Sequence, residues 1–232
     1  MEPFCLQFHR NVERQNICNL KAMNTNWREE EFWNALSHGL GVLLGCCGIF
    51  VLLSYDSFKS DYSTLSILFY GFSIVLLYSA STLYHLVSHV SWRHILRKID
   101  HISIYFLIAG TYTPVALIAL EDNNGWIIFW TVWGIALIGT ILKIFFTGRF
   151  EVLPLLLYLL MGWLIVFDWN NLVAVSTDTG INLLMLGGAF YTVGIIFYAI
   201  RKIPFNHLIW HFFVLAGSIC HFLFILIDFN FH

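Results

Sequence analysis

Two histidines one helical turn apart, His207 and His211, open the last apolar stretch of this chain, and His85 closes the second stretch. Residues at i and i+4 share one face of a helix, so His207 and His211 can hold one object together. Ionisable residues inside a membrane are rare and costly, which makes them functional candidates by default. Three histidine ligands and one open position are typical of a catalytic zinc site.

A zinc ion can lower the pKa of a bound water to about 7, which supplies a nucleophile at neutral pH. A carboxylate beside such a water can act as a general base, and Asp100 at the start of the third apolar stretch is the candidate. Ser81 precedes His85 by one turn and could bond the substrate or the water. Glu31 and Asn34 in the first stretch, together with His38, reach the same level.

Other readings of these residues stay open at this stage. Asp100 fits the N-cap of the third span equally well, because Asp is a favoured capping residue. Ser81 could bond its own helix backbone, as serines in membrane helices commonly do. His221 lies more than two turns beyond His211, so we expect it to bond a neighbouring helix. Haem is disfavoured, because two histidines on one helix face do not supply opposite axial ligands. The remaining histidines read as interfacial or as turned away from the site: His89, His94, His101 and His232.

The elements that position these side chains are membrane helices. The chain has 232 residues, of which 59% are hydrophobic and 11% charged, and apolar runs of spanning length recur along it. We predict an all-α bundle of seven transmembrane helices, because only internally bonded backbone is stable in lipid. The expected spans are 36–54, 63–87, 99–120, 126–146, 151–168, 181–200 and 207–228. The 12 Lys and Arg residues form no dense patch, so we expect no nucleic-acid partner.

The distribution of Lys and Arg predicts the orientation of the bundle. Most of them precede the first span or fall between spans two and three, four and five, or six and seven. Among them are Arg93, Arg97, Lys98, Arg149, Arg201 and Lys202, with Arg10, Arg14, Lys21 and Arg28 in the tail. We therefore expect a cytoplasmic N-terminus and an outside C-terminus in the cell membrane. Residues 1–30 are polar without a signal-peptide core, which predicts a flexible cytoplasmic tail before a single domain over 31–232.

Because spans alternate in direction, the end of span two and the starts of spans three and seven lie on the same side. This places His85, Asp100, His207 and His211 at similar depth near the cytoplasmic face. Other features of the spans predict packing. Ser37, Gly41 and Gly45 recur every fourth residue, which lets helices approach closely. Pro114 should kink the third span.

These residues stand in motifs that resemble one family. The motifs are Glu31-x-x-Asn34-x-x-x-His38, Ser81-x-x-x-His85, Asp100 with Ala109-Gly-Thr-Tyr-Thr-Pro114, and His207-x-x-x-His211. Four motifs in order over residues 27–229 resemble the hemolysin III group, the bacterial branch of the progestin and adipoQ receptor superfamily. The resemblance implies a seven-helix bundle with zinc on His85, His207 and His211, and with Ser81 and Asp100 beside the metal. Some eukaryotic relatives resemble zinc-dependent amide hydrolases that act on ceramide-type lipids.

Two functions are therefore carried forward. The first is a membrane hydrolase in which zinc-activated water attacks an amide or ester of a lipid that enters between helices. The second is a non-enzymatic membrane factor, such as a cytolysin, a sensor or a regulator of membrane state, in which zinc is structural. The group's name refers to haemolytic activity, which is a phenotype. A transporter is disfavoured by the lack of mid-span charges and repeats. Membrane lipids are the expected partners, and a homo-oligomer is left open.

Overall fold

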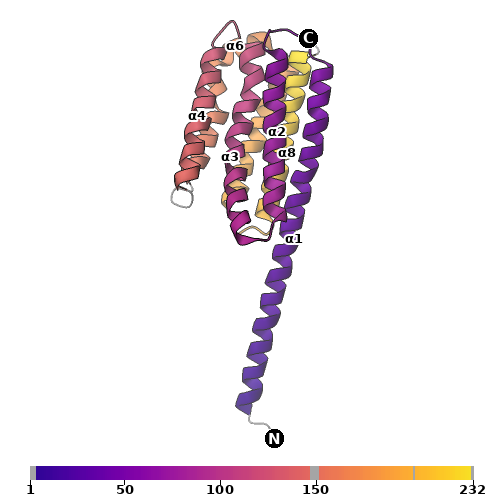
Figure 1. The fold of residues 1–232 in the computed structure, drawn as a ribbon, viewed down its shortest axis with the longest axis vertical. Coiled ribbons are helices and arrows are strands. Elements are labelled where there is room, and N and C mark those ends of the chain that lie inside the picture. Colours follow the sequence, from indigo (N-terminus) through magenta and orange to yellow (C-terminus); the bar gives the residue numbers. More distant parts are fainter. Residues whose placement is uncertain (1–3, 147–151, 201, 231–232) are drawn as a thin grey trace.

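The computed structural model describes the backbone of residues 4–146, 152–200 and 202–230, and the side chains of 27–145, 152–200 and 202–229. Within these ranges the chain forms helices and no strands, and seven of the helical segments are long and apolar enough to cross a membrane. Figure 1 shows them as one upright bundle, from which the N-terminal part of the first helix projects. The predicted all-α fold with seven spans is confirmed.

The helices follow one another through short connections. In chain order they are α1 (Phe4–Ser54), α2 (Ser63–Leu86), α3 (Val90–Pro114) with the π-helical segment η1 (Val115–Ala119), α4 (Gly125–Phe146), α5 (Val152–Gly162), the 3-10 segment η2 (Leu164–Asp168), α6 (Trp169–Val175), α7 (Asp178–Ala199), and α8 (Asn206–Ile225) with the π-helical segment η3 (Leu226–Asn230). We call the end of the bundle at Trp27 the entry end and the end at Phe229 the exit end.

Three span boundaries differ from those predicted. The helix that carries the first span is already formed before residue 36, since α1 runs unbroken through Trp27, and the third span begins at Val90 instead of residue 99. Arg93, Arg97 and Lys98 therefore lie on the first turns of α3 and not in a loop. The fifth span reaches Val175 and is interrupted. In the first and third spans, polar side chains lie on a helix that continues beyond its apolar part, and hydropathy alone does not reveal this continuation.

The glycines of the first span are packing positions, as predicted. A Cβ atom on Gly41 would collide with the ring of Tyr78, and one on Gly45 would collide with Ile74. On the facing helix, Gly71 is covered by Ile49 in the same way. Small residues let helix backbones come this close in a membrane, where packing replaces the hydrophobic effect as the driving force. The contact holds α1 against α2 near His85.

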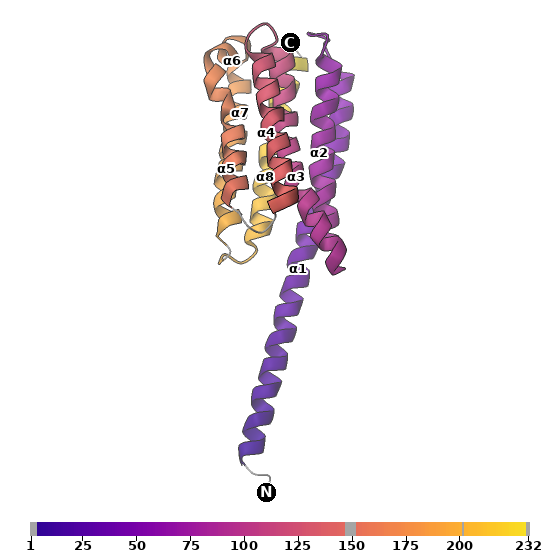
Figure 2. The same cartoon turned by 60° about the vertical axis from the view of Figure 1, so that its left-hand side comes forward.

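The remaining helices complete the bundle around α8. α2 also packs against α3, α3 packs against α4, and α7 packs against α8. Figure 2 shows α5 and α7 on the side of the bundle away from α1 and α2. The helix α8 contacts both α1 and α7, so its side chains can face both halves of the bundle.

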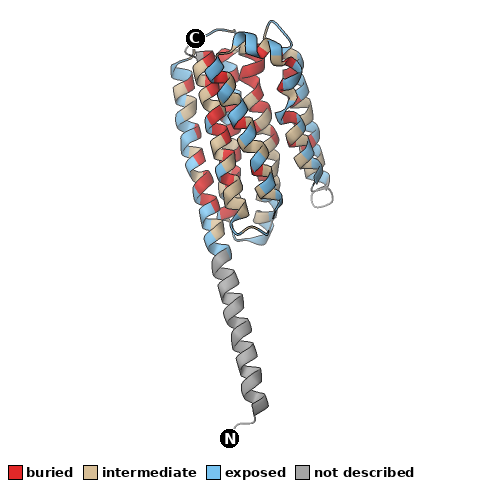
Figure 3. Ribbon diagram, turned by 180° about the vertical axis from the view of Figure 1, so that it is seen from behind, coloured by how far each residue is buried: buried red, intermediate tan, exposed pale blue. Residues whose placement is uncertain are grey.

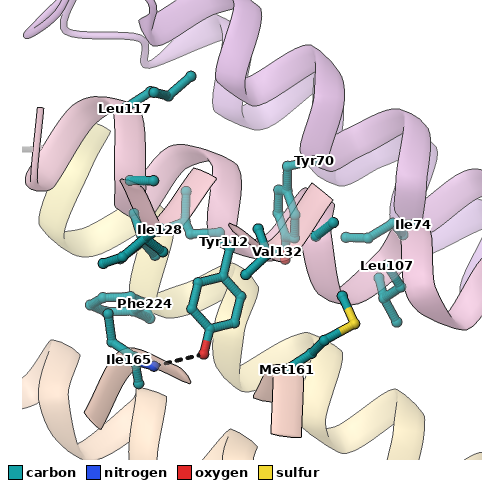
Figure 4. Packing of buried hydrophobic residues seen from close by; sticks show 14 of the residues in the cluster. Tyr70, Ile74, Leu107, Tyr112, Leu117, Ile128, Val132, Met161, Ile165 and Phe224 are labelled. Carbon is teal, nitrogen blue, oxygen red and sulfur yellow. Dashed lines mark hydrogen bonds between the residues drawn. The ribbon is translucent and has the colours of Figure 1, made fainter. Parts of the chain in front are cut away.

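The fifth span is broken in mid-course between α5 and η2. The Tyr112 hydroxyl donates to the carbonyl of Gly162 and accepts from the amide of Ile165, each at 3.0 Å. Figure 4 shows the second of these bonds among the buried apolar side chains. Irregular backbone at membrane depth requires such partners, because lipid offers none. Pro114 ends α3 two residues further on, where the helix continues as η1.

The outer surface of the bundle is apolar. Phe50 and Phe167 are 74% and 85% exposed, and many other large apolar side chains face outward along the spans. Figure 3 shows buried positions turned to the inside of the bundle and exposed ones to the outside. An apolar surface of this extent suits a bilayer and not water. The chain is a multi-pass membrane protein.

Some predictions concern parts that the structure does not describe. The flexibility of residues 1–30 stays a prediction, since the side chains before Trp27 are outside the described set. The same holds for His232 and for five residues used to predict the orientation, namely Arg10, Arg14, Lys21, Arg149 and Arg201.

Candidate metal centre

Three imidazoles meet at the entry end of the bundle. His85 lies in the last turn of α2, and His207 and His211 lie in the first two turns of α8. One ring nitrogen from each lies within 4.8 Å of the others. The ring centroids are 4.6 to 5.1 Å apart, and no two of the three rings are parallel. We call these three residues the histidine triad.

Hydrogen bonds determine which nitrogens of the triad are free. The Nδ1 atom of His85 donates to Glu31 at 2.8 Å, so the neutral form of this ring carries its free lone pair on Nε2. That Nε2 atom and Nε2 of His207 are buried and have no hydrogen-bond partner among the described residues. A histidine that binds zinc in a protein does so through a neutral imidazole nitrogen, and its other ring N–H is usually held by a carboxylate or carbonyl. The triad therefore fits a zinc ion chemically.

His211 is oriented from the first helix. Its Nδ1 atom donates to the backbone carbonyl of Asn34 at 3.2 Å, and the Ser37 hydroxyl is 3.1 Å away. Because Ser37 donates its own proton to the Asn34 carbonyl, its oxygen can accept from the imidazole. The ring of His38 stacks on the ring of His211, and the two ring centroids are 3.5 Å apart. α1 thus fixes the ring plane and the tautomer of a triad residue on α8.

Glu31 connects the triad to a positive charge. Its second carboxylate oxygen accepts from Arg93 at 2.6 Å, and its side chain is 15% exposed. Arg93 also donates to the carbonyls of Tyr84 and Val87 at the end of α2. Its guanidinium lies over the rings of Trp27 and Tyr84. Charge-assisted bonds of this kind are the strong ones, so Glu31 and Arg93 brace His85 from α1 and α3.

Asp100 lies well inside a helix. Since α3 begins at Val90 with His89 in the capping position, the alternative that Asp100 caps the third span is excluded. Its side chain is buried, with 8% exposed, and lines the same cavity as His207 and His211. Ser81 lies within hydrogen-bonding reach of this carboxylate and lines the cavity too. A carboxylate inside the membrane is costly, so it is expected to have a polar partner or a functional role.

The cavity extends from the triad between α3, α5, α7 and α8. Its wall near the triad includes three residues that the sequence reasoning did not select: His101, Tyr158 and Tyr198. The prediction that His101 turns away from the site is wrong, since His101 lines this wall beside Asp100. The positions of Tyr158 and Tyr198 could not be read from spacing, because these residues come from different spans. The next part of the wall is apolar and consists of Leu77, Ile104, Leu107, Ile108, Leu159, Ile195 and Val214. This lining suits a ligand with an apolar chain whose polar end lies at the triad.

The other histidines lie mostly as expected. His221 bonds the carbonyl of Leu184 on α7 at 3.3 Å, which confirms the predicted bond to a neighbouring helix. His89 and His94 are exposed at the entry end. The structure thus brings Glu31, Asn34, His38, Ser81, His85, Asp100, His207 and His211 to one place and leaves the exposed histidines outside it. Their chemical roles stay predictions.

Comparison with known proteins places these residues in a family context. A family model described as "Haemolysin-III related" matches residues 26–222. The chain is 45% identical over 191 residues to "Hemolysin-3 homolog" of Bacillus subtilis, covering 82% of this chain and 90% of the relative. It is 42% identical over 195 residues to "Hemolysin-3" of Bacillus cereus, covering 84% and 89%. It is 32% identical over 165 residues to human "Monocyte to macrophage differentiation factor", covering 66% of each.

Proposed function

The chain belongs to the haemolysin III family of membrane proteins, and from this premise we propose that its histidine triad binds zinc and serves the hydrolysis of a lipid amide or ester. The observation that carries the proposal is the position of the triad. Three ligand nitrogens lie within 4.8 Å of one another beside the buried Asp100 carboxylate, at the polar end of an apolar cavity.

In such a reaction the triad, Asp100 and the apolar part of the cavity have different roles. A zinc ion on His85, His207 and His211 would supply Lewis-acid activation of a water and of the scissile carbonyl. Asp100 takes a proton from the attacking water and passes it to the leaving nitrogen or oxygen. The carbonyl carbon forms a bond to the water oxygen, and its bond to the leaving nitrogen or oxygen breaks. A carboxylic acid and an amine or alcohol are released. The apolar part of the cavity holds the acyl chain and excludes bulk water.

The experiment combines metal analysis with lipid hydrolysis. We expect about one zinc per purified wild-type chain, and fatty acid release from a panel of N-acyl and O-acyl lipids that stops when a chelator is added. His207→Ala should lose both the metal and the release, whereas Asp100→Asn should keep the metal and lose the release. His94→Ala, an exposed histidine of α3, is the matched control and should keep both. A protein that holds zinc but releases no fatty acid from any lipid would overturn the hydrolase.

A structural role for zinc is the competing function. It is favoured by the way the triad and its partners tie α1, α2, α3 and α8 together through Glu31, Asn34 and Arg93. The printed names of the Bacillus relatives refer to haemolysis, which fits a non-enzymatic membrane factor. Under this alternative, zinc removal lowers the melting temperature and no lipid is hydrolysed. Dye release from liposomes by the purified protein at a low protein-to-lipid ratio would support direct lysis.

We also propose that the entry end faces the cytoplasm. Arg93, Arg97, Lys98, Lys143 and Lys202 lie at this end, and the segments at the exit end carry mainly acidic residues with Lys59. A C-terminal alkaline phosphatase fusion should be active, and a C-terminal green fluorescent protein fusion should be dark. The reverse pattern would place the triad outside.

A further inference from the structure

The cavity beside the triad is polar at two levels. On α8 it is lined by His207 and His211, then by Val214, and then by His221. On α3 the order is Asp100 and His101, then three aliphatic residues, then Thr111 and Tyr112. On α7, which runs the opposite way, Tyr198 is followed towards the exit end by Ile195 and then by Thr192 and Tyr191. From the entry end towards the exit end, α3, α7 and α8 therefore each line the cavity with polar residues, then apolar residues, then polar residues again.

We call Thr111, Tyr191, Thr192 and His221 the second polar band. Its distance from the triad follows from helix geometry. His211 and His221 are ten residues apart on one helix, which corresponds to about 15 Å of rise. Asp100 and Thr111 on α3 give a similar separation. The band therefore lies deep in the membrane, where polar side chains are costly and call for an explanation.

Hydrogen bonding makes the second polar band rich in acceptors. Thr111 donates its hydroxyl proton to the carbonyl of Leu107, and Thr192 donates to that of Gly188. The Thr111 oxygen retains acceptor capacity, and the Thr192 oxygen, which accepts from the indole of Trp163 at 3.3 Å, retains one further lone pair. His221 holds a proton on Nε2, because that atom bonds the carbonyl of Leu184.

The Nδ1 atom of His221 is consequently a bare acceptor. It is buried without a hydrogen-bond partner among the described residues. Backbone carbonyls take the donors of Thr111, Thr192 and His221, and the Tyr191 hydroxyl pairs with that of Ser218 at 2.8 Å, which leaves this acceptor unexplained. A buried polar atom without a hydrogen-bond partner is costly, so a ligand that brings a donor to this level is favoured.

We infer that the cavity takes an acyl lipid whose chain carries a hydroxyl group about 15 Å from its carbonyl end. The carbonyl end lies at the triad, which rests on the proposed function, and the chain crosses the apolar level. The hydroxyl donates to the acceptors of the second polar band. An unsubstituted chain of equal length fills the same space and leaves the band unpaired.

Binding of two natural fatty acids tests this inference. Ricinoleic acid carries a hydroxyl two thirds of the way along its chain, and oleic acid lacks it. Affinities are measured with purified protein in nanodiscs by competition against radiolabelled oleic acid. Because one net hydrogen bond contributes about 0.5–1.5 kcal/mol, ricinoleic acid should bind about two- to tenfold more tightly. Neither acid has a scissile amide or ester bond, so hydrolysis plays no part in the readout.

The variants assign the preference to the band. Thr111→Val and His221→Leu should each lower the ratio of the two affinities towards one while oleic acid still binds. Thr131→Val is the matched control, since Thr131 makes the same backbone bond on the exposed face of α4 and should leave the ratio unchanged. Equal affinities in the wild type, or a preference that survives both band variants, would overturn the inference. A preference found without zinc-dependent hydrolysis would refute the proposed function alone, and hydrolysis without a preference would refute this inference alone.

Discussion

The brace around His85 makes the sharpest prediction, because it separates a metal site from a cluster of buried histidines. Glu31→Gln keeps the size of the side chain and removes its charge. Glu31 accepts from His85 at 2.8 Å and from Arg93 at 2.6 Å. Loss of a carboxylate that orients a ligand histidine typically weakens metal binding 10- to 100-fold. The fold itself should lose little, because Arg93 keeps its bonds to the carbonyls of Tyr84 and Val87.

The loss of affinity translates into a smaller stabilisation by zinc. At a free zinc concentration of about 100 times the wild-type Kd, binding stabilises the folded protein by about 2.7 kcal/mol. If Glu31→Gln raises Kd 10- to 100-fold, the same zinc concentration gives only about 1.4 to 0.4 kcal/mol. The affinity is measured by titration against a competing chelator dye, and the stabilisation by thermal unfolding with and without zinc.

A neighbouring residue provides the control. Glu29→Gln removes the same charge two residues earlier, from an exposed position. It should leave both the affinity and the stabilisation by zinc unchanged. An unchanged affinity in Glu31→Gln, or an equal loss in Glu29→Gln, would refute the reasoning that His85 is a ligand held by this carboxylate.

Three further changes test other parts of the structure. Ser37→Ala removes an acceptor 3.1 Å from the Nδ1 atom of His211 and should weaken zinc binding several-fold in the same chelator titration, less than Glu31→Gln does. Gly41→Ala drives a methyl group into a packed aromatic ring and should lower the melting temperature, whereas Gly134→Ala meets open space and should leave it unchanged or raise it. Tyr112→Phe removes both bonds across the broken fifth span and should cost about 1–3 kcal/mol, measured by denaturant unfolding in mild detergent.

The spans were predictable because the bilayer restricts the options to apolar helices of known length. The predicted interior boundaries fall within a few residues of the observed ones in α2, α4, α7 and α8. The start of α3 was misplaced because Arg93, Arg97 and Lys98 interrupt the apolar run without interrupting the helix. The break in the fifth span had no signal in the sequence, since its stabilising partner, Tyr112, comes from another span.

The histidine triad and its surroundings were partly predictable for a similar reason. Alternation of the spans placed His85, Asp100 and the two histidines of α8 at one level without any structure. The choice between a cap and a cavity role for Asp100 required the observed start of α3, ten residues earlier. The partnership of Glu31 with both His85 and Arg93 joins three helices, and no local pattern encodes it.

By itself the sequence determined the seven helices, the level of the histidine triad and the family. Those properties depend on hydropathy, helix periodicity and span direction, which are local or additive along the chain. Only the tertiary structure decided which nitrogens are free, which carboxylate faces the cavity, and that a second polar band lies about 15 Å from the triad. Those properties depend on the rotation of each helix about its own axis. That rotation is set by packing such as Gly41 against Tyr78, between residues far apart in the chain.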